Sequence, residues 1–191
     1  MPDTNVQYLQ GVDTVAFARV KSKEGTEEAK LIPWQTALSF DPSRSTDSNP
    51  TKSGSVSTSS SLETELSVEL INNTSSIVDN LWDSLIDGTI VEVWIVHLKR
   101  LNATGQQYAW YMQAGVSENS NDNDSDDNST LEVTFSVNGT PKRGWLTLPA
   151  GAQQEIDYIF RGLGAITEID DTGDGVEWKS TDAGQNAPEK K

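Results

Sequence analysis

Alternating apolar and polar positions recur along most of the chain, which is the pattern of half-buried β-strands. In Leu62–Ile71, every second residue is apolar or Thr, and the residues between them are Glu or Ser. Leu131–Val137 alternates in the same way, and Gln106–Val116 places aromatic side chains on both faces. Such strands pack one face on a core and leave the other in water. The pattern therefore predicts antiparallel sheets.

Four further segments complete the predicted strands. Asp13–Val20 alternates, and Thr89–Leu98 is apolar on both faces, as expected of a central strand. A last strand is expected near Gln154–Arg161. Ala29–Phe40 contains Pro33, which cannot donate a ladder hydrogen bond and indicates an edge position or a bulge.

One segment has a helical period instead. Apolar residues recur at helical spacing between Ile77 and Ile86, Ser75 can cap the start, and Gly88 suits a left-handed stop. The pattern predicts one helix over residues 75–87. The carboxylates on its other side indicate a solvated face rather than a stripe of metal ligands.

Polar segments interrupt the strands. Residues 41–61 are mostly Ser, Thr, Asn and Pro, which fits a surface loop or a long hairpin that orders against another subunit. Residues 117–130 hold five acids, no base and no apolar side chain, so a solvated loop is expected. A turn-rich connection is expected at Asn138–Gly144, before Trp145–Leu148.

Length and composition favour one main domain. The chain has 191 residues, of which 35% are hydrophobic, so its core is modest. We expect an N-terminal arm at residues 1–11, a β-domain at 12–161 and a C-terminal tail at 162–191. The expected fold class is mainly β, a sandwich or barrel-like arrangement of two packed antiparallel sheets with one flanking helix.

The charge balance limits the function. Fourteen basic and 29 acidic residues give a net charge of −15, which argues against tight binding to a phosphate backbone. The same charge suits a surface past which DNA moves without adhering. Neither a basic, apolar export signal nor a membrane-spanning run is evident, so synthesis in the cytosol and no membrane association are expected.

Candidate chemistry is sparse. His97, which is the single histidine, lies in an apolar strand, and no nucleophile or phosphate-binding motif accompanies it, so no enzyme and no cofactor are expected. Two acid-rich segments, Asp122–Asp126 and Asp170–Gly175, have the alternating oxygen side chains of a calcium loop. Both lack the acid expected at the last ligand position, so solvated loops are favoured.

An ordered set of motifs resembles a known family. It comprises the Ser/Thr-rich Lys52–Ser59, a helix ending in Asp87–Thr89, then Val91–Trp94, Tyr111–Ser117 and Val133–Gly139. In this order they resemble the major tail protein, or tail tube, family of long non-contractile-tailed bacteriophages of the lactococcal-phage type. The resemblance covers roughly residues 12–160.

The resemblance implies a structural virion protein of the phage tail, made in the host cytoplasm. Hexameric rings would stack into a tube that conducts DNA during ejection, without binding it specifically. Partners would be further copies of the chain and other tail proteins: tape measure, tail terminator and distal tail. Stacking would use the arm at residues 1–11 and the loop at 41–61.

Two sets of residues are expected to matter most. The expected contacts between subunits or rings are Val6, Tyr8, Leu9, Trp34, Arg44 and Val56. The expected core anchors are Leu66, Leu81, Trp82, Trp94, Trp110 and Phe135. The alternative function is a β-sandwich module that binds carbohydrate through exposed aromatic residues or calcium through the acidic loops.

Overall fold

A computed structural model describes residues 8–149, 152, 156, 162–166 and 173–182. The chain divides into two compact units, Met1–Leu148 and Pro149–Lys191. Single 3₁₀ turns lie at Gly11–Asp13, Lys21–Lys23 and Ser180–Asp182. The other elements are β1 (Thr14–Val20), β2 (Lys30–Leu31), β3 (Gln35–Ser43), β4 (Thr46–Thr51), β5 (Gly54–Ser59), β6 (Glu63–Ile71), α1 (Ser76–Asp87), β7 (Ile90–Leu101), β8 (Gln107–Asp122) and β9 (Thr130–Leu146).

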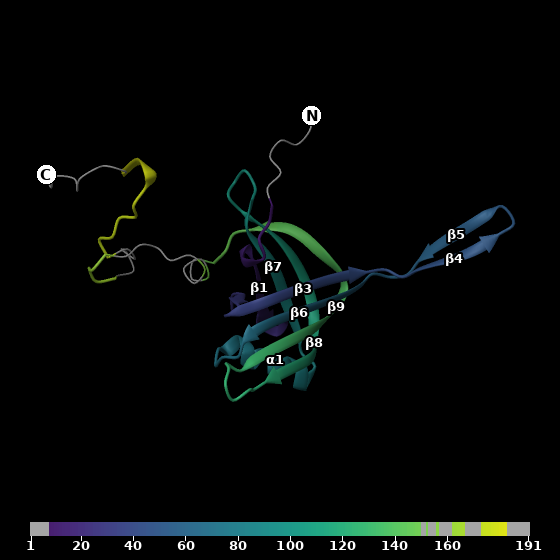
Figure 1. The fold of residues 1–191 in the computed structure, drawn as a ribbon, viewed down its shortest axis with the longest axis horizontal. Coiled ribbons are helices and arrows are strands. Elements are labelled where there is room, and N and C mark those ends of the chain that lie inside the picture. The colour runs from purple at the N-terminus through teal and green to yellow at the C-terminus, as the bar shows by residue number, and fades with distance from the viewer. Residues whose placement is uncertain (1–7, 150–151, 153–155, 157–161, 167–172, 183–191) are drawn as a thin grey trace. The chain divides into compact units, whose positions relative to one another are not determined.

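Seven strands form one antiparallel sheet in the order β2-β1-β7-β8-β9-β6-β3, and β4 and β5 form a second, two-stranded sheet (Figure 1). The large sheet curls until its ends approach. There the Gln35 side chain donates to the Ala16 carbonyl at 2.9 Å and accepts from the Ala16 amide at 2.8 Å. The predicted class is confirmed: mainly β, two antiparallel sheets and one helix. The layers around the core, however, belong to a single curled sheet.

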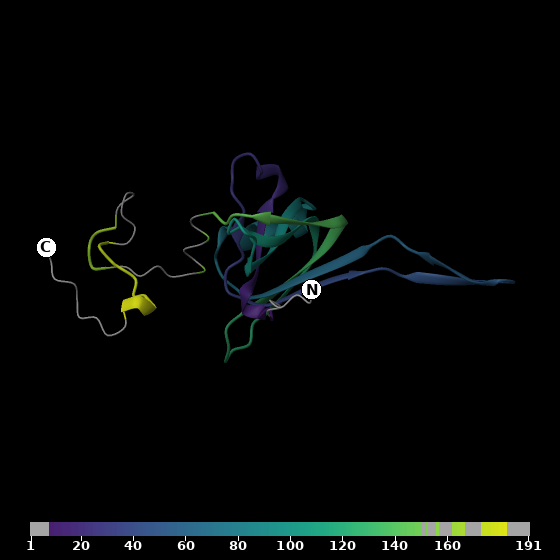
Figure 2. The same ribbon diagram turned by 90° about the horizontal axis from the view of Figure 1, so that it is seen from above.

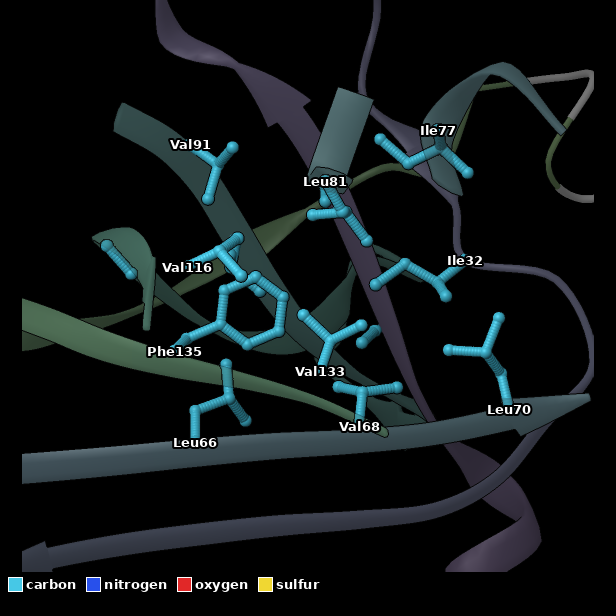
Figure 3. Packing of buried hydrophobic residues seen from close by; sticks show 14 of the residues in the cluster. Ile32, Leu66, Val68, Leu70, Ile77, Leu81, Val91, Val116, Val133 and Phe135 are labelled. Atoms are coloured by element: carbon cyan, nitrogen blue, oxygen red, sulfur yellow. The ribbon is translucent and has the colours of Figure 1, made fainter. Parts of the chain in front are cut away.

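Alternation along the strands builds the core. The burial of β6 follows the sequence pattern, with Leu66, Val68 and Leu70 fully buried and Glu65 and Glu69 exposed. These side chains meet the inward residues of β9, including Phe135, as the close view in Figure 3 shows. Helix α1 packs on the same cluster through its buried residues Ile77, Val78 and Leu81.

The predicted helix is confirmed, and Gly88 is at its C-cap in the left-handed region at φ 69°. Ser75 is at the N-cap position, but its hydroxyl makes no capping hydrogen bond among the described residues. Five of the six strands expected before residue 146 are present. The sixth, Ala29–Phe40, is wrong as a single strand: the chain leaves the sheet around Pro33, and the two parts, β2 and β3, lie at opposite ends of the sheet order. Strand β3 is an edge strand with a register shift between Gln35 and Ala37. The strand expected near Gln154–Arg161 lies almost wholly outside the described residues. Its one described residue, Ile156, is helical.

Two turn predictions are corrected by the long β8–β9 hairpin. Strand β8 continues to Asp122, which pairs with Thr130, so the acidic segment between the strands is only residues 123–129. Residues 138–144 remain in β9 and form no connection. Between the Gln113–Asn138 and Tyr111–Lys142 pairs, β9 has more residues than β8, which makes a bulge. The turn-type residues of the sequence at 138–144 correspond to this bulge.

In the second unit, the described residues form a close backbone contact. The Gly164 amide donates to the Gly173 carbonyl at 3.1 Å. A Cβ atom on Gly164 would lie 2.9 Å from that carbonyl oxygen, so only glycine fits. The apolar side chains of Leu163, Val176 and Trp178 in this unit are exposed.

Candidate assembly surfaces

The β4–β5 ribbon is an exposed hairpin that Figure 2 shows projecting beyond the curled sheet. Every residue of both strands is exposed, and Val56 is 57% exposed. At its base, the Ser60 amide donates to the Ser45 carbonyl at 2.8 Å, and Arg44 donates to the Ser60 carbonyl at 3.1 Å. An isolated two-stranded ribbon without an apolar face is marginally stable in water. Of the two alternatives for residues 41–61, the structure has the long hairpin: residues 46–59 form it with no core of its own, and residues 41–43 belong to β3.

Other expected contact residues also lie at the surface. Tyr8 and Leu9 are exposed, whereas Val6 lies outside the described residues. Trp34 is 66% exposed and has a positive φ of 54°, an uncommon conformation for a bulky residue. Its carbonyl accepts a hydrogen bond from the Ile71 amide at 3.0 Å, which holds this turn against the end of β6.

Strand β3 presents a free edge, because within the described sheet it pairs only with β6. Between this edge and the start of β1 lies a groove of about 530 Å³. Its lining residues are Gly11, Val12, Thr14, Val15, Gln35, Thr36, Ala37 and Leu38. Unpaired strand edges template pairing with another chain. This edge can therefore join a neighbouring copy.

The outward side of β3, β6, β9 and the far half of β8 forms one acidic face. Its carboxylates include Asp41, Glu65, Glu69, Glu118, Asp122 and Glu132. Ser and Thr fill most of the positions between them, and the strand segments 35–43, 63–71, 113–122 and 130–138 hold no Lys or Arg. Glu69 lies directly opposite Glu132, and Asp41 opposite Glu65. Like charges in cross-strand pairs destabilise a sheet, so this face has a cost in folding.

The expected core anchors fall in two places. Leu66, Leu81 and Phe135 are fully buried, and Trp82 and Trp110 are partly buried against the core. Trp94, by contrast, lies on the outward side of β7, because Val91, Val93 and Ile95 take the inward positions. There its ring contacts Tyr111 at 5.3 Å between centroids, and the Arg19 guanidinium lies 5.3 Å from its centroid.

Beside Trp94, a buried ionic network ties together the outward sides of β1, β7 and β8. Glu92 accepts from Arg19 at 2.6 Å and from the Tyr111 hydroxyl at 2.6 Å. Burial alone would raise the pKa of Glu92, but the hydrogen bonds from Tyr111 and Arg19 and the charges of Arg19 and Lys21 outweigh it and lower that pKa. These hydrogen bonds and charges therefore hold the ionised Glu92 carboxylate inside the subunit.

His97 is also used internally. Its Nδ1 lies 3.2 Å from the Thr14 hydroxyl, and burial, together with the nearby charge of Arg100, lowers its pKa. Within the described residues, no three His, Asp or Glu side chains are placed so as to hold a metal ion. Asp170 and Thr172 of the second acid-rich segment lie outside those residues. Nor is any helix in the described ranges long and apolar enough to cross a membrane.

No protein-family model and no curated protein matches the sequence. Solved structures do match the fold. The SPP1 tail tube aligns with a TM-score of 0.68 at 12% identity, over 95% of this chain and 96% of the other. The tail of an empty GTA particle, computed with C6 symmetry, aligns at 0.56 and 10% identity over 71% and 98%. The anti-feeding prophage baseplate aligns at 0.51 and 12% identity over 78% and 100%.

The chain therefore has the fold of tail tube proteins. This confirms, at the level of fold, the resemblance seen in the ordered sequence motifs. The lactococcal type stays a prediction. At these low identities the similarity is one of architecture, so the role of the chain is argued from its own surfaces.

Proposed function

We propose that this protein is the major tail tube protein of a long-tailed phage. Copies assemble into sixfold rings, the rings stack into a hollow tube, and DNA passes through the tube into the host. The role is structural rather than enzymatic. The matched fold supports this assignment, and so does the C6 symmetry of the GTA tail.

The observation that carries the proposal is the β4–β5 ribbon. A 14-residue excursion, Thr46–Ser59, extends as paired strands with every described side chain in β4 and β5 exposed. The subunit's own core does not stabilise the ribbon, because the ribbon buries no side chain in it. The ribbon is therefore suited to contact another ring. With the arm at residues 1–11, it would form the stacking contacts.

The free edge of β3 supports ring formation. In a closed ring, each subunit supplies a partner for its neighbour, which removes the exposed edges. The exposed Trp34 lies at the start of this edge, and a large aromatic side chain is typical of an interface.

We assign the acidic face to the wall of the channel. Its carboxylates repel one another in the subunit, which is a cost that folding alone does not explain. Facing DNA, the same carboxylates would repel phosphates and prevent adhesion during passage. The tape measure, tail terminator and distal tail proteins would contact the tube at its lumen and ends, and the acidic turn at residues 123–129 would lie at a ring rim.

Replacing the ribbon tests the proposal. Ser45 and Ser60 already lie side by side, so an Asn-Gly turn can join them in place of Thr46–Ser59. We expect the shortened subunit to keep the thermal midpoint of the full chain, because the ribbon buries no core side chain. Tubes, measured by sedimentation and negative-stain microscopy, should be lost. The Val56→Ser variant, which keeps the hairpin, should assemble more weakly than the full chain. Normal tubes from the shortened chain would contradict the stacking role.

A further inference from the structure

A cluster of aromatic and arginine side chains lies at one end of the β8–β9 hairpin. The Arg100 guanidinium lies 3.8 Å from the ring centroid of Tyr108, and the Trp145 ring lies 5.6 Å from the same centroid. Arg143 lies 5.4 Å from the Trp110 ring. This cluster is not recognisable in the sequence, because its members come from three strands, β7, β8 and the far end of β9. We call Arg100, Tyr108, Arg143 and Trp145 the arginine–tryptophan patch.

The patch joins positive charge with accessible apolar surface. Arg100 and Arg143 are exposed, and Trp145 is 46% exposed. Among the described residues, neither arginine has a carboxylate within ion-pair distance. Arg and Trp are the side chains that most often dominate binding energy at interfaces. In a chain of net charge −15, this combination suits an acidic partner.

An acidic segment lies at the other end of the same hairpin. The patch is beside the Gln107–Leu146 pair, whereas the Asp122–Thr130 pair opens the turn that contains Asp124, Asp126 and Asp127. Residues 121–128 are all exposed. In Figure 1 the β8–β9 turn and the β7–β8 turn lie at opposite ends of the curled sheet. The turn therefore does not contact the patch of its own molecule.

We infer that the arginine–tryptophan patch docks the acidic β8–β9 turn of a second copy. Each copy then offers one patch and one turn, so the contact is head-to-tail and repeats from copy to copy. Ion pairs from Arg100 and Arg143 to the turn carboxylates would orient the encounter, and Trp145 would supply the apolar contact. This inference rests on the proposed function, since it names one of the contacts between tube subunits.

Charge reversal in the full chain tests the docking. The Arg100→Glu/Arg143→Glu variant and the Asp124→Lys/Asp126→Lys variant should each raise the concentration needed for assembly at least about tenfold, a loss of about 1.4 kcal/mol per contact. The variant with all four changes should recover most of the loss, because the charges are exchanged. Wild-type assembly should also weaken with added salt.

Two comparisons keep the result specific. Lys23→Glu/Lys30→Glu makes an equal charge change away from both the patch and the β4–β5 ribbon and should assemble more nearly like wild type. Arg100→Gln/Arg143→Gln removes charge without reversing it and should show an intermediate loss. Thermal unfolding of each variant reports any damage to the subunit.

The outcomes separate the inference from the proposed function. If wild-type tubes form and both reversed variants assemble at the wild-type concentration, or if the fourfold variant shows no rescue, the docking is contradicted and the tube function stands. If the wild-type chain remains monomeric at all concentrations, both are contradicted.

Discussion

Glu92 is a buried carboxylate whose partners decide its effect on stability. The side chain is 4% exposed, and it is bound by Arg19 and Tyr111. Because its pKa is lowered in the folded state, its ionised form stabilises the fold above the ordinary value near 4.5. That contribution is lost as the pH falls through the lower, folded-state pKa.

Glu92→Gln should therefore lower the free energy of unfolding by about 2 kcal/mol at pH 7, because charge-assisted hydrogen bonds are lost. The difference from wild type should shrink below about pH 4.5. Urea unfolding at several pH values measures this. A difference that stays constant down to acid denaturation would contradict the argument.

Asn119 is a local defect of the subunit. Both polar atoms of its side-chain amide are buried without a hydrogen-bond partner among the described residues, and it pairs across the sheet with Val133. Asn119→Leu should raise the free energy of unfolding by about 1 kcal/mol, because it removes an unsatisfied buried group at similar volume. Asn121→Leu, at an exposed position of the same strand, is the control and should not stabilise. A destabilised Asn119→Leu variant would show that the amide has a partner in solution.

Trp94, which was expected in the core, shows that a sequence pattern does not always determine which way a single side chain faces. Its strand is apolar on both faces, so alternation does not tell which face is the core. The register settles it, and it places Trp94 with Arg19 and Tyr111 on the outward side. The arginine–tryptophan patch was missed for a related reason. Contacts between residues far apart in sequence depend on register, which short motifs do not contain.

At the level of elements, helix α1 was predicted well because its signals are local. The helical spacing, the N-cap position and Gly88 all lie in one continuous stretch, residues 75–88, so no contact with a distant part of the chain is needed to recognise them. The β8–β9 hairpin was predicted less well. Gly139, with φ 71°, and Pro141 indicated a turn, but paired neighbours on β8 keep the chain in the sheet as a bulge. For residues 41–61, polar composition left a surface loop and a long hairpin both open, because the strands of the β4–β5 ribbon bury nothing.

Gly88 tests the helix stop. An added Cβ atom would meet no atom within 4 Å, so the cost of Gly88→Ala comes from the left-handed backbone alone. That cost should be about 1 kcal/mol in the free energy of unfolding. Gly25 has equally open surroundings without a positive φ, so Gly25→Ala is the matched control and should be close to neutral. Equal effects of the two variants would contradict the explanation.

At the level of the whole molecule, the acidic face lowers the stability of the subunit, and its proposed benefit is that DNA does not adhere to it. Glu132→Lys should stabilise the subunit by a few tenths of a kcal/mol, because it replaces the repulsion from Glu69 with attraction. If the face lines the channel, tubes of this variant should retain DNA at low salt, whereas wild-type tubes should not. Asp83→Lys makes the same charge change on an exposed residue of α1 and should not retain DNA. Equal retention by both variants would contradict the assignment of the face.

The fold class, and the assembly role that we propose, were accessible from the sequence because alternation, charge and ordered motifs extend over most of the chain. The arrangement of surfaces was not, because it depends on how one sheet curls. The strand order and register of the curled sheet place the acids of four strands on one face, and the sequence does not contain this information. The same holds for the separation of the patch from the acidic turn.

Cryo-electron microscopy of the purified full-length chain at high concentration tests the central claim most directly. We predict hollow tubes of stacked sixfold rings, with the β4–β5 ribbon contacting an adjacent ring and Glu65, Glu69 and Glu132 facing the channel. A chain that stays monomeric, or that forms tubes with these carboxylates on the outer surface, would contradict the account.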